Sequence, residues 1–309
     1  MKKFTAGIML LFLLFTPVYA QAQTLIPGGQ VIGIRLGDPL TVAAFQEGST
    51  AQAMGMQIGD RITHINNTNV HTVAELQQTL SATDGPVAVS FIRNGQPQTV
   101  SVSPKNGLLG IYMKQCVTGI GTVTYYDPVS GDFGALGHGV NDKNGALLPE
   151  NSGTVYGASV VSVQPGASGE PGRLVGSLRA ADNLGQLDKN TPQGIFGTLN
   201  TLPDGTLMET GEPRLGDAVI RSTVKDKQLQ EYSVKILKIY PSDRQNGRNM
   251  LLRITDPQLL DTTNGIVQGM SGSPIIQDGK LIGAVTHVLV NDPTTGYGIF
   301  IENMLDAAA

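Results

Sequence analysis

Glycine is the feature that most restricts the fold of this chain. It occupies 39 of the 309 positions, tryptophan is absent, and the segments between glycines are short and rich in β-branched residues. Glycine weakens helix interiors but adopts the positive φ angles of tight turns, so this distribution favours many short strands over long helices. The sequence therefore predicts a mainly β protein, and its length suggests two domains.

Composition excludes several classes of function. The chain carries 25 acidic and 21 basic residues, and a net charge of −4 gives no basic field for phosphates, so nucleic acid is not an expected partner. A single cysteine and four histidines exclude an internal disulfide and a Cys/His zinc cluster, and we expect no metal and no cofactor. Cys116 lies in an apolar stretch and is expected to be buried rather than catalytic.

Residues 1–22 have the order of a secretory signal peptide. Two lysines precede an apolar run that ends near Phe15, and small residues follow at Ala20 and Ala22. The run is shorter than the roughly 20 residues that a membrane-spanning helix needs, and an uncleaved membrane anchor is the alternative. In either case we expect the rest of the chain to work outside the cytoplasm.

Residues 25–104 form a self-consistent unit. Thr72 and Glu75 make a capping box that predicts a helix, and Asn94-Gly95 predicts a hairpin turn. The stretch STAQAMGMQIGDRITHINNTNVHTVAELQQTL, with its Ala-x-x-x-Gly-x-x-x-Gly-Asp spacing, resembles the PDZ domains of bacterial envelope proteases. The resemblance implies an α+β domain that binds a peptide as an added strand and holds the peptide carboxylate on backbone N–H groups.

By position, the peptide-binding loop of this PDZ domain would be Val31, Ile32, Gly33 and Ile34. The alternative is that Gly33 only allows two backbones to approach closely. From residue 108 to residue 309, β-branched segments alternate with Gly, Pro, Asn and Asp at the spacing of a barrel or sandwich.

Two stretches in this second unit place a reactive side chain between glycines. They read FGALGHGV around His138 and IVQGMSGSPII around Ser271. Flanking glycines let a substrate backbone approach and let backbone N–H groups converge on one point. Acyl transfer needs both features, because a serine requires an imidazole to take its proton and the oxyanion requires prearranged donors. The sequence therefore predicts a serine hydrolase.

The surroundings of Ser271 decide between hydrolase types. The α/β-hydrolase elbow is Gly-x-Ser-x-Gly, whereas Ser273 stands here in place of the last glycine and Pro274 opens a hairpin-like segment. A histidine ahead of the serine and a Gly-x-Ser-Gly-x-Pro turn are instead the trypsin-like order. We therefore expect a trypsin-like double β-barrel in which the N–H groups of Gly269 and Ser271 bind the oxyanion.

A longer run around the serine, ITDPQLLDTTNGIVQGMSGSPIIQDGKLIGAVTHVLVNDPTTGYGIFIENML, together with GALGHGV and the PDZ-like unit, resembles the stage IV sporulation serine peptidases (SpoIVB) of endospore-forming bacteria. The resemblance implies Ser271 as nucleophile, His138 as base and Asp256 as the residue that orients the histidine. It also implies secretion into the space between the forespore and mother-cell membranes. There the enzyme would cleave itself and an inhibitory membrane protein, and so activate a late mother-cell transcription factor.

Two side chains keep alternative roles. Asp256 lies only fifteen residues before Ser271, fewer than trypsin-like enzymes leave between aspartate and serine. A turn role before proline is one alternative for it, and the other candidate acids are Asp132, Asp142 and Asp217. His287 lies in the apolar strand GAVTHVLV, where alternation predicts that it faces opposite to Val288. It is either a core histidine bonded to a backbone carbonyl or a second base.

The sequence thus predicts a secreted serine endopeptidase whose PDZ domain presents or restrains a peptide that the barrel domain cuts. Its expected partners are a peptide or membrane-protein substrate and the chain itself, with membrane association if residues 1–22 remain attached. The alternative is a noncatalytic envelope scaffold, in which PDZ peptide binding is the whole function and the glycine turns are architectural.

Overall fold

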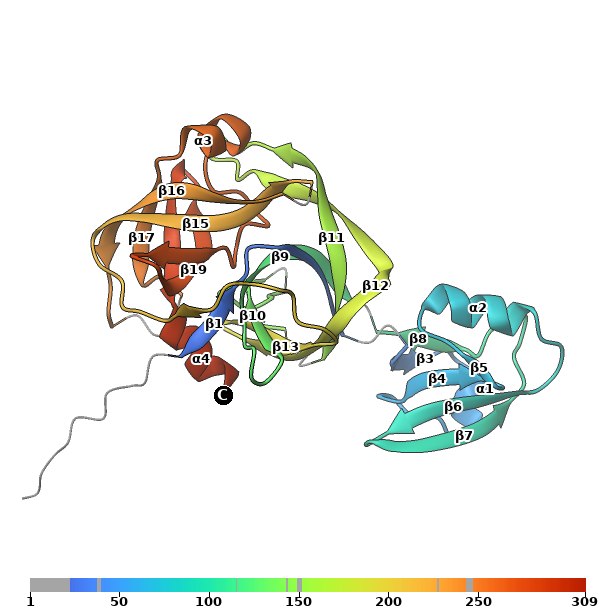
Figure 1. Ribbon diagram of the computed structural model, residues 1–309. Coiled ribbons are helices and arrows are strands. Elements are labelled where there is room, and N and C mark those ends of the chain that lie inside the picture. The colour runs from blue at the N-terminus through green and yellow to red at the C-terminus, as the bar shows by residue number, and fades with distance from the viewer. Residues whose placement is uncertain are drawn as a thin grey trace, which may run out of the picture.

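The computed structural model describes residues 23–37, 40–114, 116–142, 144–148, 152–226, 228–242 and 247–309. The segment predicted to be a signal peptide or membrane anchor, residues 1–22, lies outside this part of the chain. The described residues form two β-barrels and a smaller mixed module (Figure 1), which confirms the predicted mainly β fold. Among the described helices, none is long and apolar enough to cross a membrane.

The first barrel is built from strands that lie far apart in the sequence. Its strands are β1 (Thr24–Pro27), β2 (Val31–Leu36), β9 (Val117–Tyr126), β10 (Asp132–Ala135), β11 (Gly153–Gln164), β12 (Arg173–Thr191), β13 (Gly194–Leu199) and β14 (Met208–Glu209). They pair in the order β10-β13-β12-β11-β2-β9-β1-β14, and an additional pairing of β10 with β9 closes the first six into a ring. Buried side chains, among them Ile32, Val123 and Leu187, fill its interior.

The second barrel is closed and follows the first along the chain. Its strands are β15 (Gly216–Lys225), β16 (Gln228–Ile239), β17 (Met250–Ile254), β18 (Pro274–Gln277), β19 (Lys280–Leu289) and β20 (Asp292–Phe300), in the order β15-β16-β17-β20-β19-β18. In β16, the alternating residues Tyr232, Val234 and Ile236 are buried, as the two-residue period of a strand requires. The hairpin predicted after Pro274 is present as β18 and β19.

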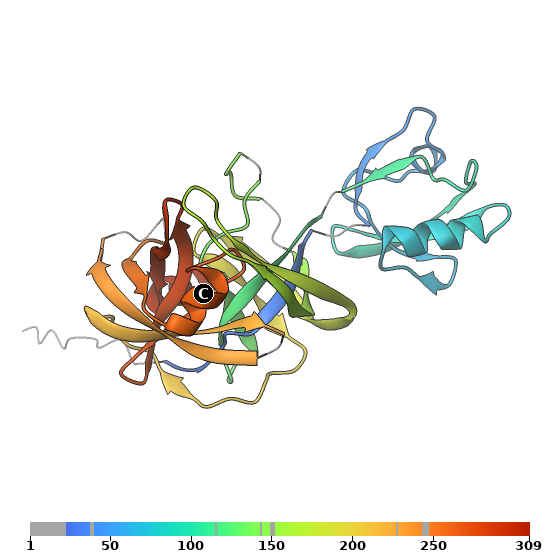
Figure 2. The same ribbon diagram turned by 90° about the horizontal axis from the view of Figure 1, so that it is seen from above.

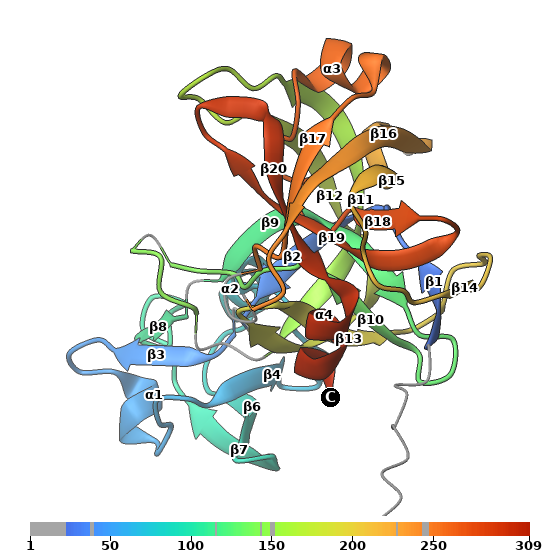
Figure 3. The ribbon, with the colours of Figure 1, turned by 90° about the vertical axis from the view of Figure 1, so that its left-hand side faces the viewer.

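Two helices belong to this half of the molecule. Helix α3 (Pro257–Thr263) connects β17 to the loop that carries Ser271. Helix α4 (Ile301–Ala308) ends the chain and contacts β19 and β20 of the second barrel as well as β10 and β13 of the first (Figure 3). The buried side chains Ile301 and Met304 share one cluster with Phe196 and Ala284, so α4 fixes the two barrels to each other.

The smaller module has the elements predicted for a PDZ domain. They are β3 (Val42–Phe45), α1 (Thr50–Ala53), β4 (Arg61–Ile65), β5 (Thr68–Asn69), α2 (Val73–Ser81), β6 (Val87–Arg93), β7 (Gln96–Val102) and β8 (Ile111–Met113). Thr72 caps α2 by accepting a hydrogen bond of 3.1 Å from the N–H of Glu75, as the capping box predicts. Asn94 and Gly95 have the positive φ angles of the predicted hairpin turn between β6 and β7.

The predicted boundaries of the PDZ domain, residues 25–104, are wrong at both ends. At the C-terminal end, β8 pairs with β3 and belongs to the module, although it lies in the segment assigned to the peptidase domain. Residues 25–36 were assigned to the PDZ domain, but β1 and β2 belong to the first barrel, where β2 pairs with β9 on one edge and β11 on the other. The PDZ module is therefore an insertion between β2 and β9, and it stands apart from the two barrels in Figure 2. Its buried core is a separate cluster that contains no side chain of either barrel.

Candidate active site

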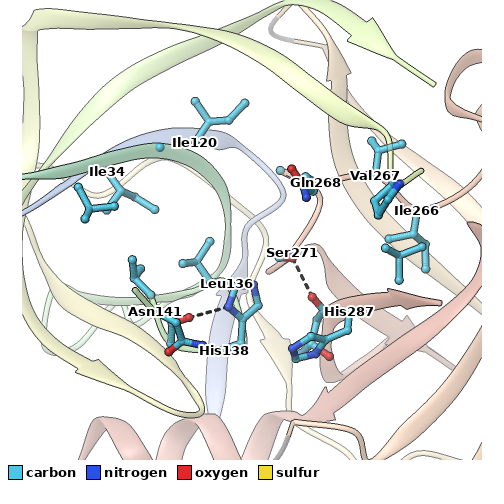
Figure 4. Close-up of a pocket in the computed structure, with 18 residues that line it drawn as sticks. Ile34, Ile120, Leu136, His138, Asn141, Ile266, Val267, Gln268, Ser271 and His287 are labelled. Carbon is cyan, nitrogen blue, oxygen red and sulfur yellow. Dashed lines mark hydrogen bonds between the residues drawn. The ribbon is translucent and has the colours of Figure 1, made fainter. Parts of the chain in front are cut away.

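A cavity of about 490 Å³ lies where the two barrels meet, and both His138 and Ser271 line it. The first barrel contributes β2, the start of β9 and the loop that follows β10. The second barrel contributes the loop before β18 and the C-terminal part of β19 (Figure 4). The apolar lining residues include Ile34, Ile120, Leu136, Ile266 and Val267. The structure thus brings together the two reactive residues that the sequence places 133 positions apart.

The loop that carries Ser271 is held by the opposite barrel. The N–H of Thr122 donates to the carbonyl of Ser271 at 3.1 Å, and the Thr122 hydroxyl donates to the carbonyl of Gly269 at 2.7 Å. The hydroxyl of Thr124 donates to the carbonyl of Gly272 at 2.8 Å. A Cβ on Gly272 would lie 2.0 Å from the carbonyl oxygen of Thr122, and its φ is +96°. Glycine at this position is therefore required for strand β9 to approach the loop.

The predicted oxyanion donors have free backbone N–H groups. Within the described residues, the N–H of Met270 donates to Val267 and that of Gly272 donates to Val285, whereas those of Gly269 and Ser271 donate to no backbone carbonyl. A backbone N–H without a partner is unusual unless water or a ligand accepts its hydrogen bond. This pattern is consistent with the assignment of Gly269 and Ser271 to the oxyanion site.

The two reactive side chains have other hydrogen-bond partners in this state. Ser271 Oγ donates to the carbonyl oxygen of Thr286 at 2.8 Å, and His138 Nδ1 lies 2.9 Å from the carbonyl oxygen of Gly139 (Figure 4). A carbonyl accepts only, so Nδ1 carries the proton and Nε2 is left as the basic nitrogen. Burial lowers the pKa of His138, and the hydrogen bond to Gly139 opposes this shift. The imidazole is therefore neutral and competent as a base near pH 7.

Asp256 does not orient His138. It is the N-cap of α3, where Oδ1 accepts from the N–H of Leu259 at 3.0 Å and Oδ2 accepts from the N–H of Ser233 at 3.3 Å. It does not line the cavity, and its carboxylate is occupied in stabilising the helix. The role inferred from resemblance is therefore wrong for this structure, and the alternative of a local role before Pro257 holds.

The other three candidate acids do not take the place of Asp256 at the cavity. Asp132 begins β10 on the surface, Asp142 accepts from the N–H groups of its own turn, and Asp217 lies in β15. None of them lines the cavity. Among the described residues, no three His, Cys, Asp or Glu side chains gather in a way that could hold a metal ion. Cys116, predicted to be buried, is only partly buried.

His287 lies beside His138, which the sequence did not predict. The ring centroids are 5.3 Å apart, with an angle of 41° between the planes. Both His287 and Val288 line the cavity. The two residues pair with consecutive positions of β20, Tyr297 and Gly296, so the predicted alternation between them is kept, and Val288 packs against the core of the second barrel. The expected carbonyl partner is not found, because Nδ1 of His287 is buried without a hydrogen bond.

The predicted peptide-binding loop is not part of the PDZ module. Val31, Ile32, Gly33 and Ile34 lie in β2, whose two edges are already paired, so no peptide can be added there. The alternative for Gly33, a close approach of two backbones, is not what the structure shows either: a Cβ would lie 1.6 Å from the side chain of Leu178, so glycine makes room for a side chain. Within the PDZ module, β3, β8, β5 and β7 each pair with a single strand among the described residues and so have an unpaired edge.

Comparison with known proteins places these observations in a family. Residues 105–305 match the family model described as SpoIVB peptidase S55, and residues 41–93 match a PDZ domain model. No curated protein matches the sequence. Similar solved structures include the Rv3671c protease in an inactive form (16% identity, 60% of this chain and 81% of that chain, TM-score 0.34). The active form of that protease, from M. tuberculosis, gives 16% identity, 62% and 72% coverage and a TM-score of 0.34. Because the S55 model covers about two thirds of the sequence, this chain belongs to the SpoIVB peptidase S55 family of serine peptidases and carries a PDZ domain.

Proposed function

We propose that this serine peptidase is an exported endopeptidase that cleaves itself and a membrane-associated regulatory protein, and thereby triggers a step of sporulation. Membership of the S55 family and the PDZ module imply peptide substrates and peptide binding. Export is supported by the signal-like residues 1–22, and the space between the forespore and mother-cell membranes is the location that the family resemblance implies. The regulatory substrate and the self-cleavage rest on the same resemblance.

One observation carries the catalytic assignment: Ser271 and His138 enter one cavity from two barrels, and β9 holds the serine loop in place. In the reaction, Nε2 of His138 takes the proton of Ser271 as Oγ bonds to the scissile carbonyl carbon. The carbonyl oxygen gains the electron pair and is bound by the N–H groups of Gly269 and Ser271. His138 then gives the proton to the leaving amine, and water repeats the sequence to release the acid.

The serine must first change its hydrogen bond. The Ser271 hydroxyl has one proton, which it donates to the Thr286 carbonyl, so it cannot donate to His138 at the same time. A rotation about the Cα–Cβ bond of Ser271 exchanges one acceptor for the other. Side-chain rotation of this kind is fast compared with turnover, so the observed state is compatible with an active enzyme.

A fluorophosphonate probe tests the assignment, because it phosphonylates an activated serine. Full-length wild type should be labelled, and Ser271→Ala and His138→Ala should lose the label. Cys116→Ser, which removes the thiol of the single cysteine in the sequence, is the control for labelling at sulfur and should be labelled like wild type. Equal labelling of wild type and Ser271→Ala would refute the catalytic role of this serine.

Self-cleavage has a separate test. Purified wild type should shorten on incubation, whereas Ser271→Ala should stay intact, and mixing a tagged Ser271→Ala chain with wild type shows whether one molecule cuts another. A wild-type chain that stays intact but binds peptides would favour the noncatalytic scaffold. Export is tested by fractionation of sporulating cells, and a cytoplasmic protein would contradict that part of the proposal.

A further inference from the structure

In the part of the chain that the structure describes, the site shows no carboxylate that orients the histidine as in a Ser-His-Asp triad. Among the described residues that line the cavity, none is acidic, and Asp256 is committed to α3. The Nδ1 hydrogen bond to Gly139 fixes the tautomer of His138, but its acceptor is the backbone carbonyl of the adjacent residue and not a carboxylate. The side chain that lies against this ring is His287, at 5.3 Å between centroids.

Strand β19 holds both members of the Ser-His pair through two consecutive residues. The carbonyl of Thr286 accepts from Ser271 Oγ, and the next side chain, His287, contacts His138. Thr286 is 2% exposed, and its hydroxyl donates to the carbonyl of Gly247 at 2.7 Å, so this point of the strand is firmly fixed. The register with β20 shifts between Val285 and His287, and such a bulge re-aims side chains beside active sites.

His287 does not have the contacts of a structural histidine. Its Nδ1 is buried without a hydrogen-bond partner, although the great majority of buried polar side-chain atoms have one. Leaving such an atom unpaired is destabilising, so the fold gains nothing from an imidazole here that an apolar ring would not supply. The feature of the site that explains an aromatic ring at position 287 is its contact with His138.

The low pKa of His287 means that only His138 carries a positive charge during the reaction. Burial lowers the pKa of His287 to about 4, and repulsion from His138 and from Arg248 acts in the same direction. Tyr297 of β20 pairs with His287 of β19. The guanidinium of Arg248 lies 5.3 Å from the centroid of the Tyr297 ring. His287 therefore stays neutral when His138 takes the proton of Ser271, and a neutral aromatic ring beside a cation is favourable.

We propose that His287 is a positioning residue for catalysis, whose neutral ring packs against His138 and holds it in place where a triad would use a carboxylate. This inference rests on the proposed function. It assigns His287 no proton transfer of its own. Its effect passes through the orientation and the buried surroundings of His138, so it should act on kcat rather than on substrate binding.

The test compares full-length His287→Ala and His287→Phe with wild type on a small fluorogenic peptide between pH 4 and pH 8. Loss of the ring in His287→Ala should lower kcat about 10- to 100-fold with KM little changed, because a misplaced catalytic group is costly. It should also move the acid limb of kcat/KM to higher pH, since His138 is then less buried and its lowered pKa rises toward the ordinary value. His287→Phe keeps a neutral ring and should retain kcat within about threefold, with the acid limb unmoved.

Matched controls separate this inference from simple loss of folding. His71→Ala alters an exposed histidine of the PDZ module and should behave like wild type. If His287→Ala does not fold, the test depends on the kcat and acid limb of His287→Phe, because phenylalanine keeps the packing. Unchanged kcat and acid limb in the alanine variant, a rise in KM alone, or a phenylalanine variant as impaired as the alanine one would each overturn the inference. Fluorophosphonate labelling of wild type but not of Ser271→Ala shows that the proposed function itself still stands.

Discussion

Removal of the PDZ module by a tight turn should leave a folded peptidase. Leu36 and Val117 are directly paired at the ends of β2 and β9, so residues 37–116 can be replaced by Asn-Gly, the turn that best joins two antiparallel strands. The PDZ core is a separate cluster, and its removal therefore takes no buried side chain from either barrel. The shortened chain should unfold cooperatively and should still be labelled by the fluorophosphonate at Ser271.

A deletion of residues 25–104, which the sequence-based boundaries would suggest, provides the contrast. It removes β1 and β2, whose six buried apolar side chains are Leu25, Ile26, Val31, Ile32, Ile34 and Leu36. At about 1.5 to 3 kcal/mol each, their loss amounts to about 9 to 18 kcal/mol, as much as the whole stability of a typical domain. This variant should be unfolded by circular dichroism and unlabelled. A folded 25–104 deletion, or an unfolded Asn-Gly variant, would refute the insertion of the PDZ module between β2 and β9.

Three further measurements test the site. Gly272→Ala should lose labelling and more than about 3 kcal/mol of stability in a denaturant titration, because its Cβ would meet the carbonyl of Thr122 at a positive φ. The control is Gly279→Ala, which is also at positive φ but has no atom within 4 Å of the added Cβ. This control should lose about 1 kcal/mol of stability and keep its activity. Asp256→Ala should lose about 1 kcal/mol of capping energy with kcat nearly unchanged, whereas a drop approaching the roughly 10⁴-fold of a triad aspartate would restore its catalytic role. The acid limb of wild-type kcat/KM should lie below pH 6.5, because His138 must be neutral to accept a proton and burial lowers its pKa; a limb above pH 6.5 would contradict the buried environment.

Local sequence signals predicted local structure well. The capping box at Thr72 and the Asn94-Gly95 turn are present because each depends on contacts within a few residues. The domain boundary failed because the segment VIGIRL is compatible with any β environment, and its partners Thr154 and Thr122 lie about ninety or more positions away. Strand pairing over such distances is decided by the whole fold and not by the segment.

The same distinction applies to the site. The meeting of His138 and Ser271 in one cavity was predictable, because glycines on both sides of a reactive residue have few purposes other than close approach. The role of Asp256 could not be tested from spacing, since a residue before proline serves equally well as a helix cap. The contact of His287 with His138 could not be predicted from strand alternation, because it depends on how the loop after β10 in the first barrel packs against β19 of the second.

The position of the PDZ insertion is explained by the pairing at its two ends. Inside the module, its first and last strands, β3 and β8, pair through Val42 and Met113. Just outside it, Leu36 of β2 pairs with Val117 of β9. A module that folds on its own core thus presents its two ends side by side, which removes most of the entropy cost of closing so long a loop. The inserted domain then serves the first barrel as a large turn, and this is why two residues of the right conformation should be able to replace it.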